Sequence, residues 1–219
     1  MKILYLYPEE FWGKPSLMTI FNRISNYLNF KKKELKTKIE EHYIDLRLED
    51  LPEFTPENIK VYRKKLIQIL DGLYTSFKFD LVAISCYSSF NYLNSVEVAF
   101  LIKKFIDSNI IIVVGGVHAS MCPDNFQPGN LPEYLYKSYS KKYSPFDFLI
   151  KEEGEFSFFQ LIKDLENGYY KREEKESKNC IVLKPLLVED LNEIPLLNLD
   201  LFKKYKSKLQ SIDSIWLDF

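Results

Sequence analysis

The chain has 219 residues, of which 46% are hydrophobic and 28% charged, and its formal net charge is −1. This composition is typical of a globular protein with a hydrophobic core, and it argues against disorder. The even balance of charge argues against nucleic acid or an anionic membrane as the main partner. No apolar run reaches the roughly 20 residues that a membrane span needs, and the apolar start is too short for a signal sequence, so we expect a cytoplasmic protein.

Strands are predicted first, because continuous apolar runs recur along the first 150 residues. None of these four runs alternates with polar residues, which is typical of strands that are covered on both faces of a parallel sheet. A fifth run is more polar and alternates, which predicts an edge strand. In chain order the five predicted strands span residues 3–7, 41–46, 81–86, 110–114 and 146–150.

Helices are predicted between the strands, where apolar residues recur with helical spacing. Ser16 and Thr55 are candidate N-caps for the first two. The four predicted helices span residues 16–27, 56–73, 94–106 and 155–165. The alternation of strands and helices predicts an α/β fold: a flavodoxin-like (Rossmann-like), doubly wound, five-stranded parallel sheet over residues 1–167. In such a sheet ligands bind at the carboxyl ends of the strands.

Residues 168–219 are expected to form a separate, short C-terminal extension. It begins with a charged connector that is predicted to be a solvated loop. Short strands are predicted at 181–183 and 186–188, followed by an extended segment at 193–200 and a helix from Leu201.

The loops after the third and fourth predicted strands contain most of the polar candidates. The hydroxyls of Ser85, Ser88 and Ser89 lie just before a helix, where they can cap it or bind an anion. Gly115 and Gly116 permit either a tight turn or the close approach of a ligand to the backbone. His118 is a structural histidine, a metal ligand or a base on this reasoning.

Acidic side chains follow the fifth predicted strand, at the start of a helix. Glu153 and Glu155 complement the helix N-terminus there, or act as paired acids in catalysis. An enzyme that uses His118 with one of these carboxylates as acid and base is therefore one alternative, and flavin or nucleotide binding on the same fold is another. The three cysteines lie far apart, so the sequence predicts neither a disulfide framework nor a metal site.

Two of these loops, taken in order, resemble a known family. The segments Gly115-Gly116-x-His118-Ala119-Ser120, followed by Pro123, and Asp147-Phe148-x-x-x-x-Glu153-Gly154-Glu155 are similar to motifs of the cobalamin-binding domain of cobalamin-dependent radical S-adenosylmethionine enzymes. Those motifs read Gly-Gly-x-His-x-Ser-x-x-Pro and Asp-x-x-x-x-Gly-Glu-Gly-Glu. The connector ending at residues 194–197 resembles the one that leads into the family's catalytic barrel, so the resemblance covers roughly residues 1–200.

The resemblance implies that the chain binds cobalamin, with the corrin ring across the carboxyl edge of the sheet and the nucleotide tail in a cleft beside the third and fourth strands. It implies that the two glycines leave room for the tail, that the serines and His118 line its channel, and that the two carboxylates hold their loop by accepting backbone N–H bonds. The implied cofactor-binding residues are Ser85, Tyr87, Ser88, Ser89, Gly115, Gly116, His118, Ala119, Ser120, Glu153, Gly154 and Glu155.

The sequence also departs from the family's pattern. Corrinoid proteins with a cobalt-ligating histidine carry it after the first strand, and loop 7–15 has none, so we expect base-off cobalamin without a histidine ligand. Glu152 replaces the first glycine of the acidic motif. The chain lacks the Cys-x-x-x-Cys-x-x-Cys motif, so we expect no iron–sulfur cluster and no catalytic residues on it. We therefore expect a module that works with a radical S-adenosylmethionine barrel in cis or in trans, or alternatively a cobalamin-free paralogue with an interaction or regulatory role.

Overall fold

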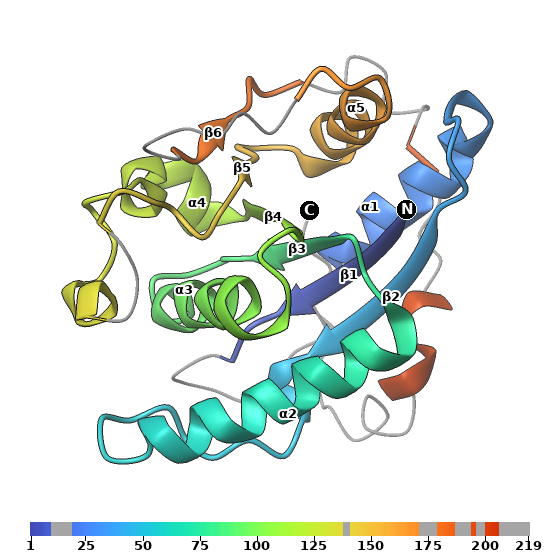
Figure 1. Cartoon of the computed structure of the whole chain (residues 1–219). Coiled ribbons are helices and arrows are strands. Elements are labelled where there is room, and N and C mark those ends of the chain that lie inside the picture. The colour runs from blue at the N-terminus through green and yellow to red at the C-terminus, as the bar shows by residue number, and fades with distance from the viewer. Residues whose placement is uncertain (10–18, 138–140, 171–178, 187–193, 196–199, 206–219) are drawn as a thin grey trace.

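The computed structural model describes residues 1–9, 19–137, 141–170, 179–186, 194–195 and 200–205. Its centre is a parallel sheet with the strand order β2-β1-β3-β4-β5-β6 (Figure 1). The strands are β1 (Lys2–Tyr7), β2 (Glu40–Asp45), β3 (Leu81–Ser85), β4 (Ile111–Gly115), β5 (Phe148–Leu149) and β6 (Ile181–Val182). The first five follow the order of a flavodoxin-like sheet, in which β1 lies between β2 and β3 and the strand order, not the strand direction, reverses at that point.

The predicted number of five strands is wrong, because the sheet has six. The sixth strand comes from the predicted C-terminal extension, at the first of the two short strands that we expected there. The backbone N–H of Ile181 donates to the carbonyl of Asp147 (2.9 Å), and that of Leu183 donates to the carbonyl of Leu149 (2.9 Å). A short apolar run can thus extend the sheet wherever the free edge of a neighbouring strand supplies unpaired backbone groups.

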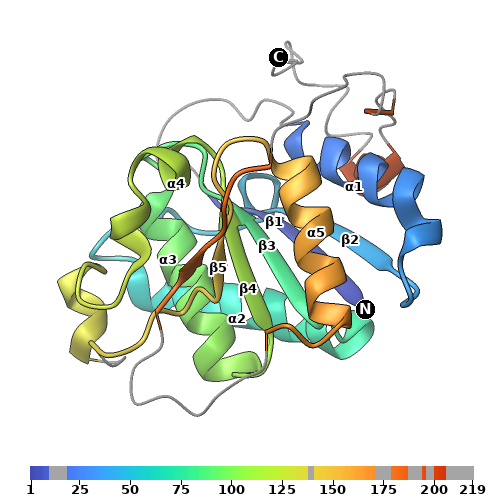
Figure 2. The ribbon, with the colours of Figure 1, turned by 90° about the horizontal axis from the view of Figure 1, so that it is seen from above.

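The described residues form five α-helices: α1 (Ile20–Lys31), α2 (Ile59–Phe77), α3 (Tyr92–Leu101), α4 (Val117–Met121) and α5 (Gly154–Glu166). Helices α2 and α3 pack on one face, and α1 and α5 on the other, as Figures 1 and 2 show. The two cores divide β1 by alternate residues, since Leu4 and Leu6 face the first pair of helices and Ile3, Tyr5 and Tyr7 face the second. Both faces of the sheet are therefore buried, as the unbroken apolar runs predict.

The second helix begins at Ile59 rather than Pro56, and the Thr55 hydroxyl accepts a hydrogen bond from the Asn58 N–H at 3.3 Å, in the turn before it. The predicted N-cap Ser16 lies outside the described residues, and α1 begins at Ile20. None of the described helices combines the length and apolarity that crossing a bilayer requires.

Helix α3 ends in a π-helical turn, Ile102–Ile106, that brings a lysine into the protein. The ammonium of Lys103 lies 2.7 Å from Asp147 Oδ2 and also donates to the backbone carbonyl of Ile110. The same carboxylate oxygen accepts the backbone N–H of Ile112 at 2.8 Å. Because both charged side chains are at least 92% buried, this ion pair joins α3, β4 and β5 inside the fold.

The C-terminal segment returns to the sheet beside β2. A 3₁₀ helix, Asp200–Tyr205, places the Phe202 ring edge-on to Tyr43, with the ring centroids 4.6 Å apart. The Tyr205 hydroxyl accepts the backbone N–H of Asp45 at 3.1 Å. The predicted helix from Leu201 is thus present as a 3₁₀ helix, whereas residues 187–188 of the predicted second short strand lie outside the described residues.

Candidate functional site

The predicted site lies where β3, β4 and β5 end. Ser85 at the end of β3 is in register with Gly115 at the end of β4, and Val114 pairs with Leu149 of β5. The parallel register therefore brings the serine-rich, twin-glycine and acidic loops to one edge of the sheet, as predicted. Residues 10–18 of the loop after β1 lie outside the described residues.

Gly116 has a structural reason to be glycine. Its φ of +103° favours glycine, and an added Cβ would lie 2.7 Å from the carbonyl oxygen of Cys86. The Cys86 N–H donates to the Gly115 carbonyl (2.8 Å), and the His118 N–H donates to the Cys86 carbonyl (3.1 Å). The space beside Gly116 is therefore occupied by the neighbouring backbone. A Cβ on Gly115 would be in ordinary contact with Ile150, 3.5 Å from its carbonyl oxygen.

Both ring nitrogens of His118 have protein partners. Nδ1 lies 3.0 Å from Ser89 Oγ, and Nε2 lies 3.2 Å from the amide nitrogen of Asn125. Because that amide nitrogen can only donate, Nε2 accepts and Nδ1 carries the proton that is donated to Ser89. Burial lowers the pKa of His118, which keeps the ring neutral. The arrangement is that of a structural histidine that holds α4 against the loop after β3.

Ser120 connects two of the predicted loops. Its hydroxyl donates to the Gly116 carbonyl at 3.0 Å and accepts the backbone N–H of Glu152 at 2.9 Å. In the loop after β3 the Ser88 N–H donates to the side chain of Asn91 at 3.2 Å. The described contacts of these two serines are therefore within the protein. Ser85 and Ala119 are both buried, at 4% and 0% exposure.

The acidic loop is held differently from the expectation. Glu153 is the N-cap of α5 but makes no side-chain capping bond. Glu155 is 2% exposed, and its Oε1 forms an ion pair with Arg23 Nε of α1 at 2.8 Å. Gly154 packs beside Ile24, where a Cβ would lie 3.2 Å from the Ile24 Cδ1. The loop is thus attached to α1, and a carboxylate of the motif is neutralised by an arginine.

Two further residues of the acidic motif are explained by local structure. Glu152 has a φ of +60°, a conformation that favours glycine, so the glycine of the family motif would fit here without strain. Asp147 lies at the start of β5, at the opposite edge of the sheet, and its carboxylate is the buried partner of Lys103. Asp147 is therefore a structural residue.

Exposed apolar side chains gather on the loops and first helical turns after β3 and β4. Their exposed fractions lie between 40% and 77%, for Tyr87, Phe90, Leu93, Val117 and Met121. We call these five residues the apolar rim. Phe90 is next to Ser89 in the chain and Tyr87 lies two residues before it, whereas Val117 directly precedes His118. The contact between Ser89 and His118 therefore joins the two segments that carry the rim. Exposed apolar groups of this kind mark binding surfaces more often than scattered single residues do.

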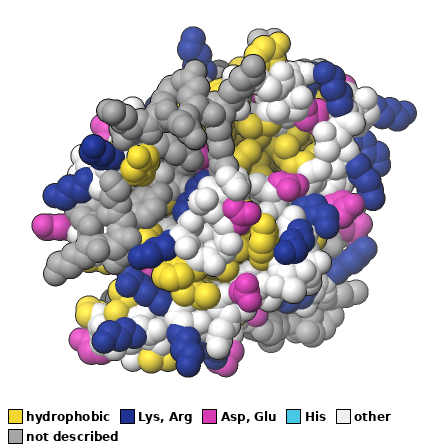
Figure 3. Space-filling model, in the orientation of Figure 1, with side chains coloured by type: hydrophobic (Ala, Val, Ile, Leu, Met, Phe, Trp, Pro, Cys, Tyr) yellow, Lys and Arg dark blue, Asp and Glu magenta, His cyan; other side chains and the backbone are white. Residues whose placement is uncertain are grey.

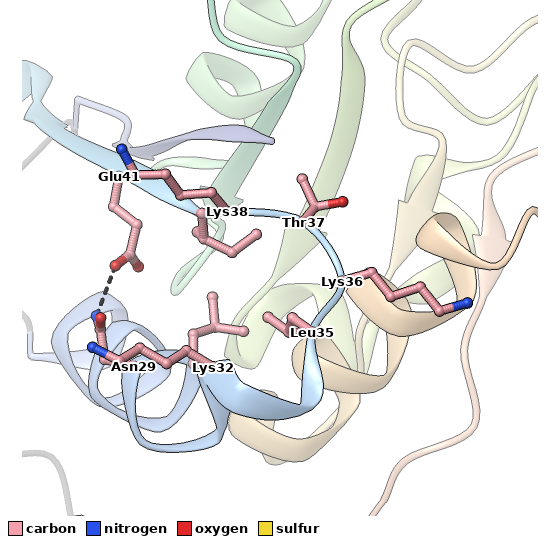
Figure 4. A pocket seen from close by; sticks show the side chains of 9 residues that line it. Asn29, Lys32, Leu35, Lys36, Thr37, Lys38 and Glu41 are labelled. Carbon is pink, nitrogen blue, oxygen red and sulfur yellow. Dashed lines mark hydrogen bonds between the residues drawn. The ribbon is translucent and has the colours of Figure 1, made fainter.

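The two described cavities lie elsewhere, between α1 and β2. The first has a volume of about 350 Å³, and Figure 4 shows the Asn29 amide bonded to Glu41 at 2.8 Å within it. It is lined by Leu28, Asn29, Lys32, Leu35, Lys36, Thr37, Lys38, Ile39 and Glu41. The second, of about 410 Å³, lies between Ser25, His42 and the 3₁₀ helix. Neither opens on the apolar rim.

The described residues that could bind a metal ion or react as thiols are not clustered. No three His, Cys, Asp or Glu side chains among them are grouped to hold a metal ion. Burial raises the pKa of the Cys86 thiol to about 12, and Cys180 is also buried, whereas Cys122 is exposed. On the face drawn in Figure 3, basic and acidic side chains are interspersed, in keeping with the balanced net charge.

Residues that sequence reasoning missed come from other elements. Arg23 precedes its partner Glu155 by 132 positions, and nothing in the sequence connects them. Asn125 lies in the 3₁₀ turn after α4 and was not among the expected contacts of His118. Asn91 and Asn94 border the serine-rich loop, and only their polar amide side chains could have indicated from the sequence that they make contacts there.

Comparison with known proteins supports the fold. No protein-family model and no curated protein matches the chain. A solved structure of the cobalamin-dependent S-adenosylmethionine radical enzyme OxsB with aqua-cobalamin bound is similar over 95% of this chain, with 21% sequence identity and a TM-score of 0.57. The chain spans 25% of that enzyme's length. A UDP-GlcNAc 2-epimerase from Neisseria meningitidis matches with a TM-score of 0.35 and 9% identity, which is too low to support an argument. The chain thus has a Rossmann-like α/β fold with a parallel sheet, like part of a cobalamin-dependent enzyme.

Proposed function

We propose that this chain is a cobalamin-binding module that holds the corrin ring across the carboxyl edge of β3 and β4. The apolar rim carries this proposal. A corrin ring presents a broad, largely apolar face, which complements exposed Tyr, Phe, Leu, Val and Met side chains better than a charged ligand would. Two further points support it: the fold is similar to that of a cobalamin-dependent enzyme whose structure was solved with aqua-cobalamin bound, and sheets of this kind bind ligands at the carboxyl ends of their strands.

The proposed cofactor is base-off and has no histidine ligand on cobalt. The chain has two histidines. Both ring nitrogens of His118 are engaged with Ser89 and Asn125, and His42 in the middle of β2 packs against Phe77, with the ring centroids 5.4 Å apart. Neither position favours an imidazole that reaches a cobalt ion above β3 and β4.

In this proposal the nucleotide tail enters beside the loops after β3 and β4. The nucleotide tail can fit between these loops only if the loops move apart, because Gly116 packs on Cys86 and His118 is hydrogen-bonded to Ser89. Separating the His118 and Ser89 side chains would free two polar groups for the tail. The serines would then offer hydroxyl groups to its phosphate, and Ser120 would keep the acidic loop in place through Glu152.

The roles of this chain's residues are binding and orientation. Bound cobalamin would supply a cobalt centre for methyl or electron transfer. The apolar rim would exclude water from the ring face, and the ion pair of Glu155 with Arg23 would keep the loop after β5 fixed beside it. The radical S-adenosylmethionine barrel that the resemblance implies would act in cis or in trans.

The test is retention of hydroxocobalamin through gel filtration, read from the corrinoid absorbance of the protein peak. The wild-type protein should retain it, and the double variant Val117→Ser/Phe90→Ser should lose most of it. The matched control Val61→Ser/Phe30→Ser changes exposed residues of the same types on α2 and α1, and it should bind as the wild type does. No retention by the wild type, or equal retention by both double variants, would overturn the proposal.

A second candidate is a cobalamin-free paralogue that uses the apolar rim to bind another protein. The observation that favours it is the direct packing of the loops after β3 and β4, together with the position of both cavities between α1 and β2. This candidate predicts that the wild type retains no corrinoid. It also predicts that Val117→Ser/Phe90→Ser abolishes capture of a barrel-bearing partner protein, whereas the control variant does not.

A further inference from the structure

Three buried polar atoms beside the end of β1 have no hydrogen-bond partner among the described residues. They are Glu9 Oε2, the hydroxyl oxygen of Tyr62 and the amide oxygen of Asn94. Tyr62 is 0% exposed and Asn94 is 1% exposed. Buried polar atoms in native proteins are nearly always paired with protein, water or a ligand, so these three unpaired atoms indicate a missing partner.

The three side chains come from different elements around the end of β1, and Tyr62 and Asn94 each interact with Glu9. Glu9 follows β1, Tyr62 lies in the first turn of α2, and Asn94 lies in the first turn of α3. The Asn94 amide nitrogen donates to the Glu9 carbonyl at 3.0 Å. The Glu9 carboxylate is close enough to Tyr62 to help burial raise the pKa of its hydroxyl. This point is the reversal between β1 and β3, where doubly wound sheets bind ligands.

The charged groups around this point leave Glu9 without a neutralising partner in the described contacts. Burial, and then the Glu53 carboxylate, raise the pKa of Glu9 to about 7, so its carboxyl is largely uncharged at slightly acidic pH. The other nearby carboxylate, Glu97, is already bound by Arg63 (Nη2 to Oε2, 3.0 Å) and by the Tyr134 hydroxyl (3.2 Å). The environment therefore disfavours an anionic ligand.

The unpaired atoms complement a group that both donates and accepts hydrogen bonds without carrying charge. Asn94 offers an acceptor, Tyr62 a donor, and the neutral Glu9 carboxyl both. Resting on the proposed function, we propose that Glu9, Tyr62 and Asn94 form a polar subsite for one of the primary carboxamide groups on the rim of the corrin ring. The carboxamide N–H₂ donates to Asn94, and its carbonyl accepts from Tyr62.

The test compares hydroxocobalamin with cobinamide, which keeps the ring carboxamides and lacks the nucleotide tail. Tyr62→Phe should weaken the binding of both corrinoids by the same factor, about fivefold, because it removes one neutral hydrogen bond. It should not lower the stability of the free protein, since the hydroxyl that it removes has no described partner. The matched control is Tyr74→Phe on the same helix, whose hydroxyl donates to Asp107 at 2.9 Å; it should leave both affinities unchanged.

The outcomes separate the subsite from the proposed function. Unchanged affinity of Tyr62→Phe for both corrinoids overturns the subsite while the proposed function stands. A loss confined to hydroxocobalamin also overturns it, because the hydroxyl would then face the nucleotide tail. Wild-type protein that binds neither corrinoid overturns both. As a second variant, Glu9→Gln should bind cobinamide equally well at pH 6 and pH 7.5, whereas the wild type should bind more weakly at the higher pH.

Discussion

Replacing Gly116 by alanine should destabilise the fold strongly. Gly116 has φ 103° and ψ 176°, a region that only glycine adopts without strain, and forcing another residue into it costs about 1–3 kcal/mol. The added Cβ would lie 2.7 Å from the Cys86 carbonyl oxygen, and relieving such a contact in a packed region costs about 1–3 kcal/mol more. The expected loss is therefore roughly 2–6 kcal/mol, a large part of the ~5–15 kcal/mol by which domains are stable.

Urea unfolding followed by circular dichroism measures this loss. With a slope of about 2 kcal/mol per molar, the midpoint should fall by about 1–3 M. Gly115→Ala is the matched control, because Gly115 lacks a positive φ and its Cβ would be in ordinary contact, 3.5 Å from the Ile150 carbonyl oxygen. That variant should lose less than about 1 kcal/mol. If Gly116→Ala unfolded at the wild-type midpoint, the assignment of Gly116 to close backbone packing would be wrong.

Three further predictions concern charged residues. Lys103→Met leaves the Asp147 carboxylate buried without its ammonium partner, so the free energy of unfolding should fall by about 3–5 kcal/mol in the same assay. The control Lys104→Met changes an exposed lysine and should lower it by less than about 1 kcal/mol. Glu152→Gly removes a left-handed non-glycine residue and should stabilise the fold by up to about 1 kcal/mol, and a loss of stability would contradict the strain at this position. The pKa of Glu9 is raised to about 7 in the folded state, so the folded protein favours the protonated carboxyl. The resulting contribution to stability is fully present below the ordinary glutamate pKa and is lost as the pH rises through 7. Wild-type stability should therefore fall relative to Glu9→Gln between pH 5 and pH 8, and parallel pH curves would refute the shift.

The fold could be predicted from the sequence because the strands at the centre of its sheet are unbroken apolar runs. Residues 3–7 and 81–86 read as buried strands, and both lie at the centre of the sheet. The sixth strand could not be predicted as part of that sheet, since Ile181–Val182 is two residues long and its pairing depends on the free edge of β5. Helix α4 was missed for a similar reason: its five residues lie within a loop and are too few to show a period.

The shared position of the candidate loops could be predicted from the sequence, whereas most of their contacts could not. The parallel register brings the predicted loops to one edge, which follows from strand order alone. The partners of His118 and Glu155 could not be predicted, because Asn125 and Arg23 lie on elements whose contacts appear only in three dimensions. That the twelve expected residues bind a corrinoid remains a prediction. The apolar rim was also missed, since exposed and buried hydrophobic residues look alike in a sequence.

The π-helical turn at Ile102–Ile106 allows only one number of residues between α3 and the segment that follows it. One residue more or fewer in this turn would rotate everything after it by about 100° around the helix axis. Shortening the turn to a regular α-helical one would carry the Lys103 side chain away from Asp147 and point its charge along the outer surface of the helix. Natural relatives that keep the buried lysine and aspartate should therefore tolerate many substitutions in this segment but neither insertions nor deletions.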